Sequence, residues 1–293
     1  MPIYYPDILD QGTKPRPFTY TDKDVMLYAL GIGMGRDPLN RDELAFVYEK
    51  GLKVVPTVAT VLASGAGRGE PLPRREGHRE SAPNFLMLVH GEQKVELHKP
   101  LPPTGTFTIQ SRTIGAFDKG KDKGAVLVGQ TIWTDETGAE IAKLTSSSFC
   151  RGDGGFGGPS EGQPEPHEIP SRKPDISIDY ETRPDQALLY RLNGDRNPLH
   201  SDPDSAKRSG FPRPILHGLC TYGLTCRAVL QTIVGYDSDR IASHQARFSA
   251  PVFPGDTVTV DLWKDDTTVS FEARVKERGA TVIKNGKALL RSA

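Results

Sequence analysis

Residues Tyr190 to His200 read YRLNGDRNPLH, and a shorter version of the same stretch, GRDPLN, occupies Gly35 to Asn40. Each follows an apolar, helix-like run, at 186–192 and at 23–33. A glycine, Gly194, closes the second run, because glycine tolerates the left-handed conformation that ends many helices. The recurrence of one helix-and-turn pattern predicts that the chain contains two copies of one structural unit.

The segments that follow the two turns also match. Each copy continues with a second helical stretch behind a proline, at 57–62 after Pro56 and at 217 to about 234 after Pro214. Strand-like runs come next, at 95–101, 106–109, 125–134 and 141–149 in the first copy and at 245–252, 257–260, 268–276 and 281–290 in the second. We therefore expect an α+β fold in which each copy has one long helix followed by an antiparallel sheet.

A segment rich in glycine and proline, residues 152–174, separates the copies and shows no hydrophobic period. It could be a disordered insertion within one domain, but the matching flanks favour a linker between two. The domains are accordingly expected at 1–151 and 175–293, which suits a chain of 293 residues.

The copies differ at two chemically important places. When the Pro-Leu pairs are aligned, Asn40 occupies the place of His200. When Pro56 is aligned with Pro214, Thr60 occupies the place of Gly218. The first copy thus lacks both the titrating imidazole and the bare glycine. We expect the second copy to react and the first to bind.

Composition narrows the function. Lys+Arg and Asp+Glu both number 37, so the net charge is zero, which argues against a nucleic-acid partner held by bulk charge. A local basic patch for a phosphorylated ligand stays possible. No run approaches the ~18 apolar residues of a membrane span, so no membrane partner is expected.

The cysteines and termini bear on location. Cys150, Cys220 and Cys226 show no CxxC spacing, so neither a disulfide framework nor a zinc knuckle is expected. The N-terminus lacks the pattern of a secretory signal, and the final residues do not form a peroxisomal tripeptide. We expect a cytoplasmic protein.

The second turn gathers groups suited to acid–base chemistry. Asp195, Asn197 and His200 lie within six residues, on a turn set by Pro198. A carboxylate and an imidazole so placed can hold a water molecule and move its protons at neutral pH. Alternatively, Asp195 and Asn197 only close Asx turns and cap the next helix. A metal site is disfavoured, because two ligands five residues apart have no nearby His/Cys cluster to complete them.

Gly218 starts the long helical run of the second copy, 18 residues after His200. A glycine there leaves backbone N–H groups uncovered, and such groups favour negative charge developing on an oxygen. Ordinary helix entry is the alternative.

These segments also carry a family resemblance. Residues 190–206, YRLNGDRNPLHSDPDSA, resemble the hydratase 2 motif of the MaoC-like dehydratase family, with Ala206 as the small residue that follows it. Residues 214–223, PILHGLCTYG, and 86–102, LMLVHGEQKVELHKPLP, resemble further segments of two-domain hydratase 2 enzymes. The resemblance implies a tandem double hot-dog fold and reversible hydration of trans-2-enoyl-CoA to (3R)-3-hydroxyacyl-CoA.

The resemblance also implies roles for individual residues. Asp195 and His200 resemble the catalytic pair, Asn197 the residue that orients them, and the N–H of Gly218 the oxyanion donor. Four more positions resemble contacts to the CoA thioester: His90, Gly91, Lys119 and Phe248. No metal or other cofactor is implied, since CoA is part of the substrate. By the same resemblance we expect a homodimer, which would help to cover exposed sheet edges.

Two other functions stay open. The chain could act as a dehydratase on a bulky 3-hydroxyacyl-CoA, with a branched or steroid side chain. Six glycines of the first half hint at space or mobility there: Gly31, Gly33, Gly35, Gly65, Gly67 and Gly69. The chain could also be a non-catalytic acyl-CoA binding protein, although this would not account for the second turn.

Overall fold

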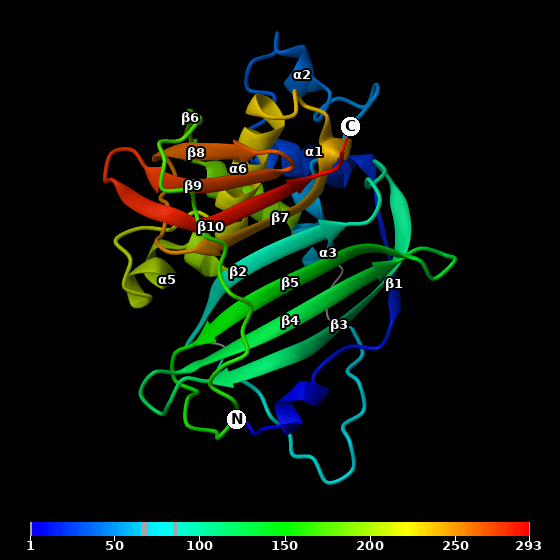
Figure 1. Cartoon of the computed structure of the whole chain (residues 1–293), viewed down its shortest axis with the longest axis vertical. Helices are drawn as coiled ribbons and strands as arrows, with labels where there is room; N and C mark the ends of the chain where they lie inside the picture. The colour runs from blue at the N-terminus through cyan, green and yellow to red at the C-terminus, as the bar shows by residue number, and fades with distance from the viewer. Residues whose placement is uncertain (1, 66–68, 85–86, 293) are drawn as a thin grey trace. The chain divides into compact units, whose positions relative to one another are not determined.

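The computed structural model of the chain (Figure 1) describes residues 2–65, 69–84 and 87–292. It contains two compact units that interleave along the chain. Unit 1 comprises Met1–Phe18, Gly67–Lys94 and Phe107–Pro166; unit 2 comprises Thr19–Ala66, Val95–Thr106 and His167–Ala293. The helices of the first copy thus belong to unit 2, together with the second copy. The domain limits expected at 151 and 175 stay a prediction.

Unit 1 is built on long antiparallel strands. The strands of the first copy are β1 (Arg16–Tyr20), β2 (Leu88–Leu97), β3 (Gly105–Asp118), β4 (Ala125–Thr134) and β5 (Glu140–Cys150), in the order β1-β3-β4-β5-β2. The short 3-10 helix η1 (Asp7–Asp10) precedes them. Ile8 of η1 packs with Ala125, Leu127 and Cys150 in a buried apolar cluster, so the N-terminal segment closes one end of this core.

Unit 2 joins a second antiparallel sheet to the main helices. Its strands are β6 (Ile176–Glu181), β7 (Ile241–Phe248), β8 (Thr257–Asp265), β9 (Thr268–Val275) and β10 (Ala280–Leu290), in the order β7-β10-β9-β8-β6. Its α-helices are α1 (Asp22–Gly31), α2 (Arg41–Leu44), α3 (Ala59–Gly65), α4 (Gln186–Tyr190), α5 (Pro203–Arg208) and α6 (Gly218–Thr232). Short 3-10 helices connect them: η2 (Pro56–Val58), η4 (Arg191–Asn193), η5 (Pro198–His200) and η6 (Ser238–Arg240).

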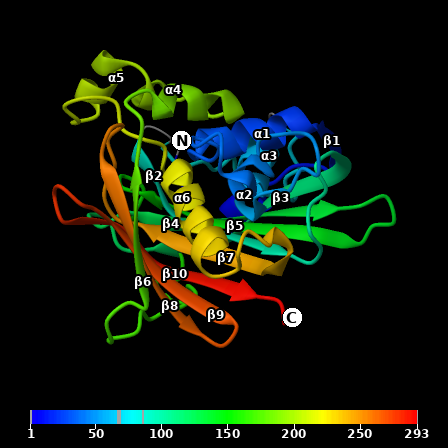
Figure 2. The ribbon, with the colours of Figure 1, turned by 90° about the horizontal axis from the view of Figure 1, so that it is seen from above.

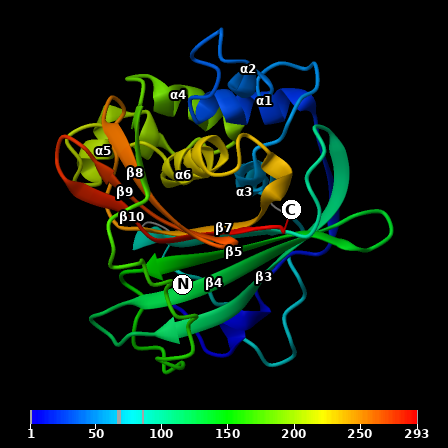
Figure 3. The ribbon, with the colours of Figure 1, turned by 45° about the horizontal axis from the view of Figure 1, so that its top comes forward.

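The long helix α6 is the centre of unit 2. It contacts β6 to β10 on one side, and ten of its residues are buried. Figures 2 and 3 show α6 lying across the face of this sheet, with α1 and α4 in a further layer beyond it. A helix that is covered on both sides must be apolar nearly all round, as the sequence of α6 is.

A close approach between α1 and α6 depends on Gly223. A Cβ atom at this position would lie 2.5 Å from Ile32 Cγ2 and 2.7 Å from Tyr28 Oη. The Tyr28 hydroxyl is buried there and donates a hydrogen bond to Thr57 Oγ1 at 2.9 Å. Gly223 therefore lets an aromatic ring of the first copy pack directly on the helix of the second.

We predict that Gly223→Ala destabilises the protein by about 1–3 kcal/mol, because the added methyl overpacks the contact with Tyr28 and Ile32. Elsewhere in a helix the same change would stabilise by about 1 kcal/mol. Chemical denaturation measures the difference. Gly129→Ala in β4 is the control, because its Cβ would meet nothing nearer than 3.7 Å. Equal stability of the two variants would contradict the packing argument.

Most expected elements are present, with shifted limits. The run expected at 217 to about 234 is α6, and those expected at 125–134 and 141–149 are β4 and β5. Two strands were not expected, β1 and β6, which end the sheet order. Edge strands bury only part of one face, so their hydrophobic signal is weak. The expectation of one long helix per copy holds for α6, whereas the first copy has η2 followed by α3.

The Gly/Pro segment is anchored to unit 1 by Asp118. The Asp118 carboxylate accepts N–H groups from Gly120 and Gly155 at 2.8 Å and from Gly157 at 2.7 Å. Burial alone would raise the pKa of Asp118, but these donors outweigh it and the pKa lies below its usual range. The start of the linker is thus an ordered loop.

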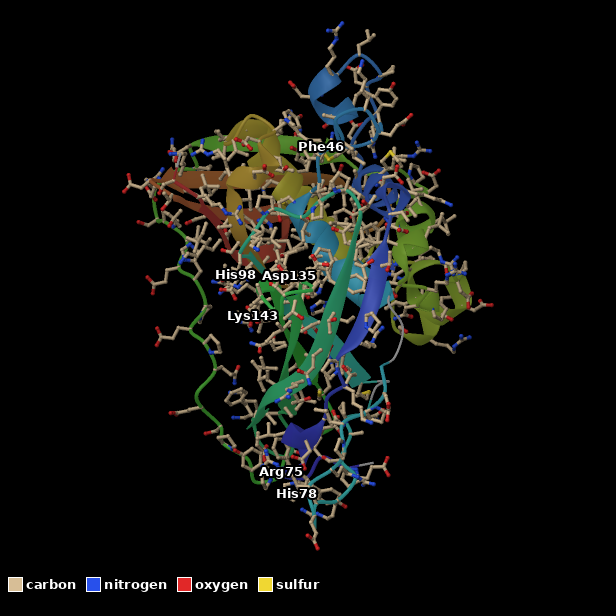
Figure 4. All side chains as sticks on the ribbon, turned by 90° about the vertical axis from the view of Figure 1, so that its right-hand side faces the viewer. Phe46, Arg75, His78, His98, Asp135 and Lys143 are labelled. Carbon is tan, nitrogen blue, oxygen red and sulfur yellow. The ribbon has the colours of Figure 1, made fainter. Side chains whose placement is uncertain are left out.

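A second acidic anchor fixes the N-terminal segment of unit 1. Asp10 accepts a contact from His78 Nδ1 at 2.6 Å and from Arg75 Nε at 3.1 Å, and Asp7 pairs with Arg79 Nε at 3.0 Å. Figure 4 shows Arg75 and His78 together at one end of the ribbon. These pairs hold the loop 69–84 against η1.

Three of the six glycines named above, Gly31, Gly33 and Gly35, do not indicate empty space. A Cβ at Gly31 would lie 3.2 Å from Tyr190 Cδ2, so this residue is closely packed. Gly33 and Gly35 have φ of 85° and 73°, which glycine adopts without strain. Gly67 lies outside the described residues. The hint of room for a bulky acyl group is therefore wrong at Gly31, and local backbone geometry accounts for Gly33 and Gly35.

Candidate active site

The second turn is a pair of consecutive Asx turns. Gly194 has φ 119° and ends η4, as expected. Asp195 Oδ1 then accepts the N–H of Asn197 at 3.1 Å, and Asn197 Oδ1 accepts the N–H of Leu199 at 3.0 Å. The expectation that Asp195 and Asn197 close Asx turns is thus confirmed. It leaves the second carboxylate oxygen of Asp195 and the whole imidazole of His200 to be explained.

The first copy folds the same turn without the chemistry. Asp37 Oδ1 accepts the N–H of Leu39 at 2.9 Å, as Asn197 does for Leu199, and Asn40 caps α2. Gly35 stands where the second copy has Asp195. Its N–H donates to the buried carboxylate of Glu43 at 2.9 Å, which also pairs with Arg227. A buried ion pair therefore lies beside the turn of the first copy, and the turn itself does not require an imidazole.

We predict that Asn197→Ala costs about 1 kcal/mol of stability, because the N–H of Leu199 loses its acceptor. Asn197→Asp is the matched variant and should stay close to the parent, since Asp37 performs the same task in the first copy. Urea denaturation compares the two. If the Asp variant loses as much as the Ala variant, the side-chain acceptor is not what holds this turn.

His200 is buried, with 8% of its surface exposed. Its Nδ1 lies 2.9 Å from the carbonyl oxygen of Ile215, which can only accept, so Nδ1 carries the proton and Nε2 has a free lone pair. Burial lowers the pKa of His200, against the opposing effects of this carbonyl and of Asp195. The ring is thus a neutral base of fixed orientation.

The structure adds a second imidazole, which the sequence analysis did not single out. His217 is 1% exposed, and its ring stacks on that of His200 with centroids 3.7 Å apart and an interplanar angle of 26°. Its Nε2 lies 3.2 Å from the backbone oxygen of Asp195. Burial and the neighbouring His200 lower the pKa of His217. Its position directly before Gly218 is the feature of the sequence that could have identified it.

Asp195, His200 and His217 each offer a donor atom, and these atoms lie within 4.8 Å of one another. A third candidate ligand, His217, thus lies near the turn, contrary to what the sequence predicted. The geometry nevertheless suits a metal poorly. Stacked rings direct their in-plane lone pairs side by side, and a tetrahedral ion needs them to converge.

Gly218 follows His217 in the chain and lies against Phe248. Gly218 is the first residue of α6, and the hydrogen bonds of the helix begin with Cys220 and Thr221, which donate to the His217 carbonyl. The Gly218 N–H takes no part in the hydrogen bonds within the helix, because it belongs to the first residue. A Cβ at this position would lie 3.3 Å from the ring of Phe248, so glycine also makes room for that ring.

The residues predicted to contact the CoA thioester fall into both units. Phe248 lies in unit 2 with Asp195, Asn197, His200 and Gly218, whereas three lie in unit 1: His90, Gly91 and Lys119. His90 Nε2 is 3.1 Å from the Glu92 carbonyl, and Lys119 Nζ donates to the Ser160 carbonyl at 2.6 Å. Their role in ligand binding stays a prediction.

Within the described part of the chain, none of the helices has the length and apolar character needed to cross a lipid bilayer.

Comparison with known families divides the chain near the Gly/Pro segment. The family described as "MFE-2 hydratase 2 N-terminal domain" matches residues 18–152, and the "MaoC like domain" matches residues 166–286. An enoyl-CoA hydratase of Mycobacterium tuberculosis is 39% identical over 99% of both chains. The peroxisomal enoyl-CoA hydratase 2 of Arabidopsis thaliana is 38% identical over 91% of this chain and 89% of the plant protein.

Solved structures agree. The crystal structure of a MaoC-like dehydratase from Phytophthora capsici has a TM-score of 0.86 and 37% identity, and it covers 98% of both chains. A Mycobacterium tuberculosis protein described as having a double hot-dog fold has a TM-score of 0.55 at 13% identity, over 95% of this chain and 97% of its own. The second likeness bears on the fold alone, and it confirms the predicted double hot dog.

Proposed function

The chain belongs to the MaoC-like family of hydratase 2 enzymes, and from this membership and the site we propose that it reversibly hydrates a trans-2-enoyl-CoA to (3R)-3-hydroxyacyl-CoA. One observation carries the mechanism. The Nδ1–H of His200 is committed to the Ile215 carbonyl, which leaves Nε2 as a base in the group that it forms with Asp195.

The Asp195 carboxylate and His200 Nε2 hold one water molecule between them. The thioester makes C3 of the substrate electrophilic, and His200 accepts a proton as the water oxygen bonds to C3. The electrons of the C2–C3 double bond move to the thioester oxygen and form an enolate. The enolate collapses as the proton is returned to C2, so the product gains the elements of water and the site is regenerated.

The N–H of Gly218 donates to the enolate oxygen. It lies at the start of a 15-residue helix, whose dipole also favours negative charge there. The chemistry on this chain calls for no metal or redox cofactor, and CoA enters as part of the substrate.

We predict that Asp195→Asn and His200→Gln each reduce hydration by about two or more orders of magnitude, since each replaces a group that can exchange a proton with the water by an amide that cannot. Loss of the enoyl-thioester absorbance gives the rate of hydration, and chiral analysis of the product gives the configuration at C3. Asp185→Asn and His167→Gln are matched controls within unit 2 and should stay within about twofold. Near-normal turnover in either site variant, or an (S) product, would contradict the proposal.

A separate comparison isolates the Gly218 N–H. Gly218→Ala keeps the N–H and adds a methyl against Phe248, whereas Gly218→Pro removes the N–H. Proline is tolerated at a first helical position, and the extended backbone of His217 suits the residue before it. We expect the proline variant to have a kcat about 10²–10³ below that of the alanine variant. Equal kcat values would exclude the oxyanion role.

The same site can run in the dehydrating direction. A relative named "3-hydroxyacyl-thioester dehydratase Y" from Mycobacterium tuberculosis is 40% identical over 89% of this chain. Measuring activity across acyl-CoA substrates of different length and branching tests whether the site accepts a bulky acyl group. Binding of enoyl-CoA without turnover would indicate a non-catalytic acyl-CoA binding protein. The homodimer and the cytoplasmic location stay predictions.

A further inference from the structure

His217 has no part in the mechanism above, yet it is the most buried polar side chain of the site. Its ring lies against the face of His200 and 5.0 Å from the ring of Tyr190. Its Nδ1 is buried and has no partner among the described residues. A buried polar group of this kind costs free energy, so its presence calls for a role.

The contacts of His217 join the two groups that hold the water. Its Nε2 lies within hydrogen-bonding distance of the Asp195 backbone carbonyl, which can only accept, so Nε2 carries the proton. Its ring face lies on the ring of His200. One side chain thus contacts both the residue that supplies the carboxylate and the residue that supplies the base.

The charged groups around the pair are few. Asp195 and Arg191 act on His217 from the α4–η5 side, and the Tyr190 ring lies beside it. On His200 the electrostatic influence is that of Asp195. Phe248, against Gly218, carries no charge. Two imidazolium rings cannot share a face at this distance, so His217 must be neutral whenever His200 holds the proton of the water.

We propose that His217 is a positioning residue, which ties the backbone of Asp195 to the His200 ring and keeps a neutral ring packed on the base. This rests on the proposed hydration, because the base is the one assigned there. Its first role needs the Nε2–H donor, and its second needs the ring. Different substitutions separate the two roles.

His217→Phe keeps a ring but loses the donor to Asp195. We expect kcat to fall about 10–100-fold with little change in KM, because the carboxylate is no longer held in place for the water. His217→Gln places an N–H donor near the position of Nε2 but loses the ring. We expect His200 to be more hydrated in this variant and to titrate closer to the ordinary histidine value near 6.5.

Two measurements read these effects. NMR titration of the His200 ring protons in the intact protein reports its protonation without any substrate, and steady-state kinetics report kcat and KM. The acidic limb of kcat/KM should move to higher pH in the Gln variant and stay in place in the Phe variant. His244→Phe is the control, because His244 is equally buried and stacked, on Phe271, but lies outside the site. It should lower stability and leave the titration of His200 unchanged.

The outcomes are decisive in both directions. An unchanged His200 titration in the Gln variant overturns the role of the ring, and a kcat within about twofold of the parent in the Phe variant overturns the tie to Asp195. If the Gln variant fails to fold, His217→Asn replaces it in the titration. If the parent protein leaves enoyl-CoA unconsumed, the proposed hydration fails, and the NMR titration still decides whether His217 controls the protonation of His200.

Discussion

The hydrogen bond from His200 Nδ1 to the Ile215 carbonyl is the constraint on which the site depends. It joins the turn after α4 to the segment that enters α6, and these are 15 residues apart in the chain. By fixing the tautomer, this hydrogen bond leaves the lone pair of the His200 ring on Nε2. By fixing the ring plane, it offers a face to His217, whose neighbour Gly218 presents the N–H of the helix start. The tautomer of His200 and the orientation of its ring, which stacks on His217, thus depend on one backbone contact.

The duplicated turn separates what the fold needs from what the chemistry needs. Both copies use a side-chain oxygen to close the turn over a leucine N–H, at Asp37 and at Asn197. The second copy adds a carboxylate at the first position of the turn and an imidazole at the last. In the first copy a glycine stands at the first of these positions and donates to Glu43, which pairs with Arg227 of α6. The same backbone turn thus carries a carboxylate and an imidazole in one copy and lies beside an internal ion pair in the other.

Much of this could be predicted from the sequence, because strong periodicity and turn chemistry are local signals. The helix α6, the strands β4 and β5, and the left-handed Gly194 follow from such patterns. The part played by His217 could not be read in this way, since its stacking on His200 depends on how α6 is entered. For the same reason, the sequence did not identify His217 as the third member of the cluster with Asp195 and His200. The order at the start of the linker was hidden as well, because it depends on residues in a different part of the sequence, among them Asp118 and Lys119.

The packing of Tyr28 on Gly223 makes the two copies depend on one another. Helix α1 of the first copy packs in the core around α6, and Gln186 of the second copy donates to the Gly31 carbonyl at the end of that helix. The core around α6 therefore includes side chains of both copies. A break in the chain at the linker would leave α6 on a fragment with an open apolar face where Tyr28 and Ile32 had packed.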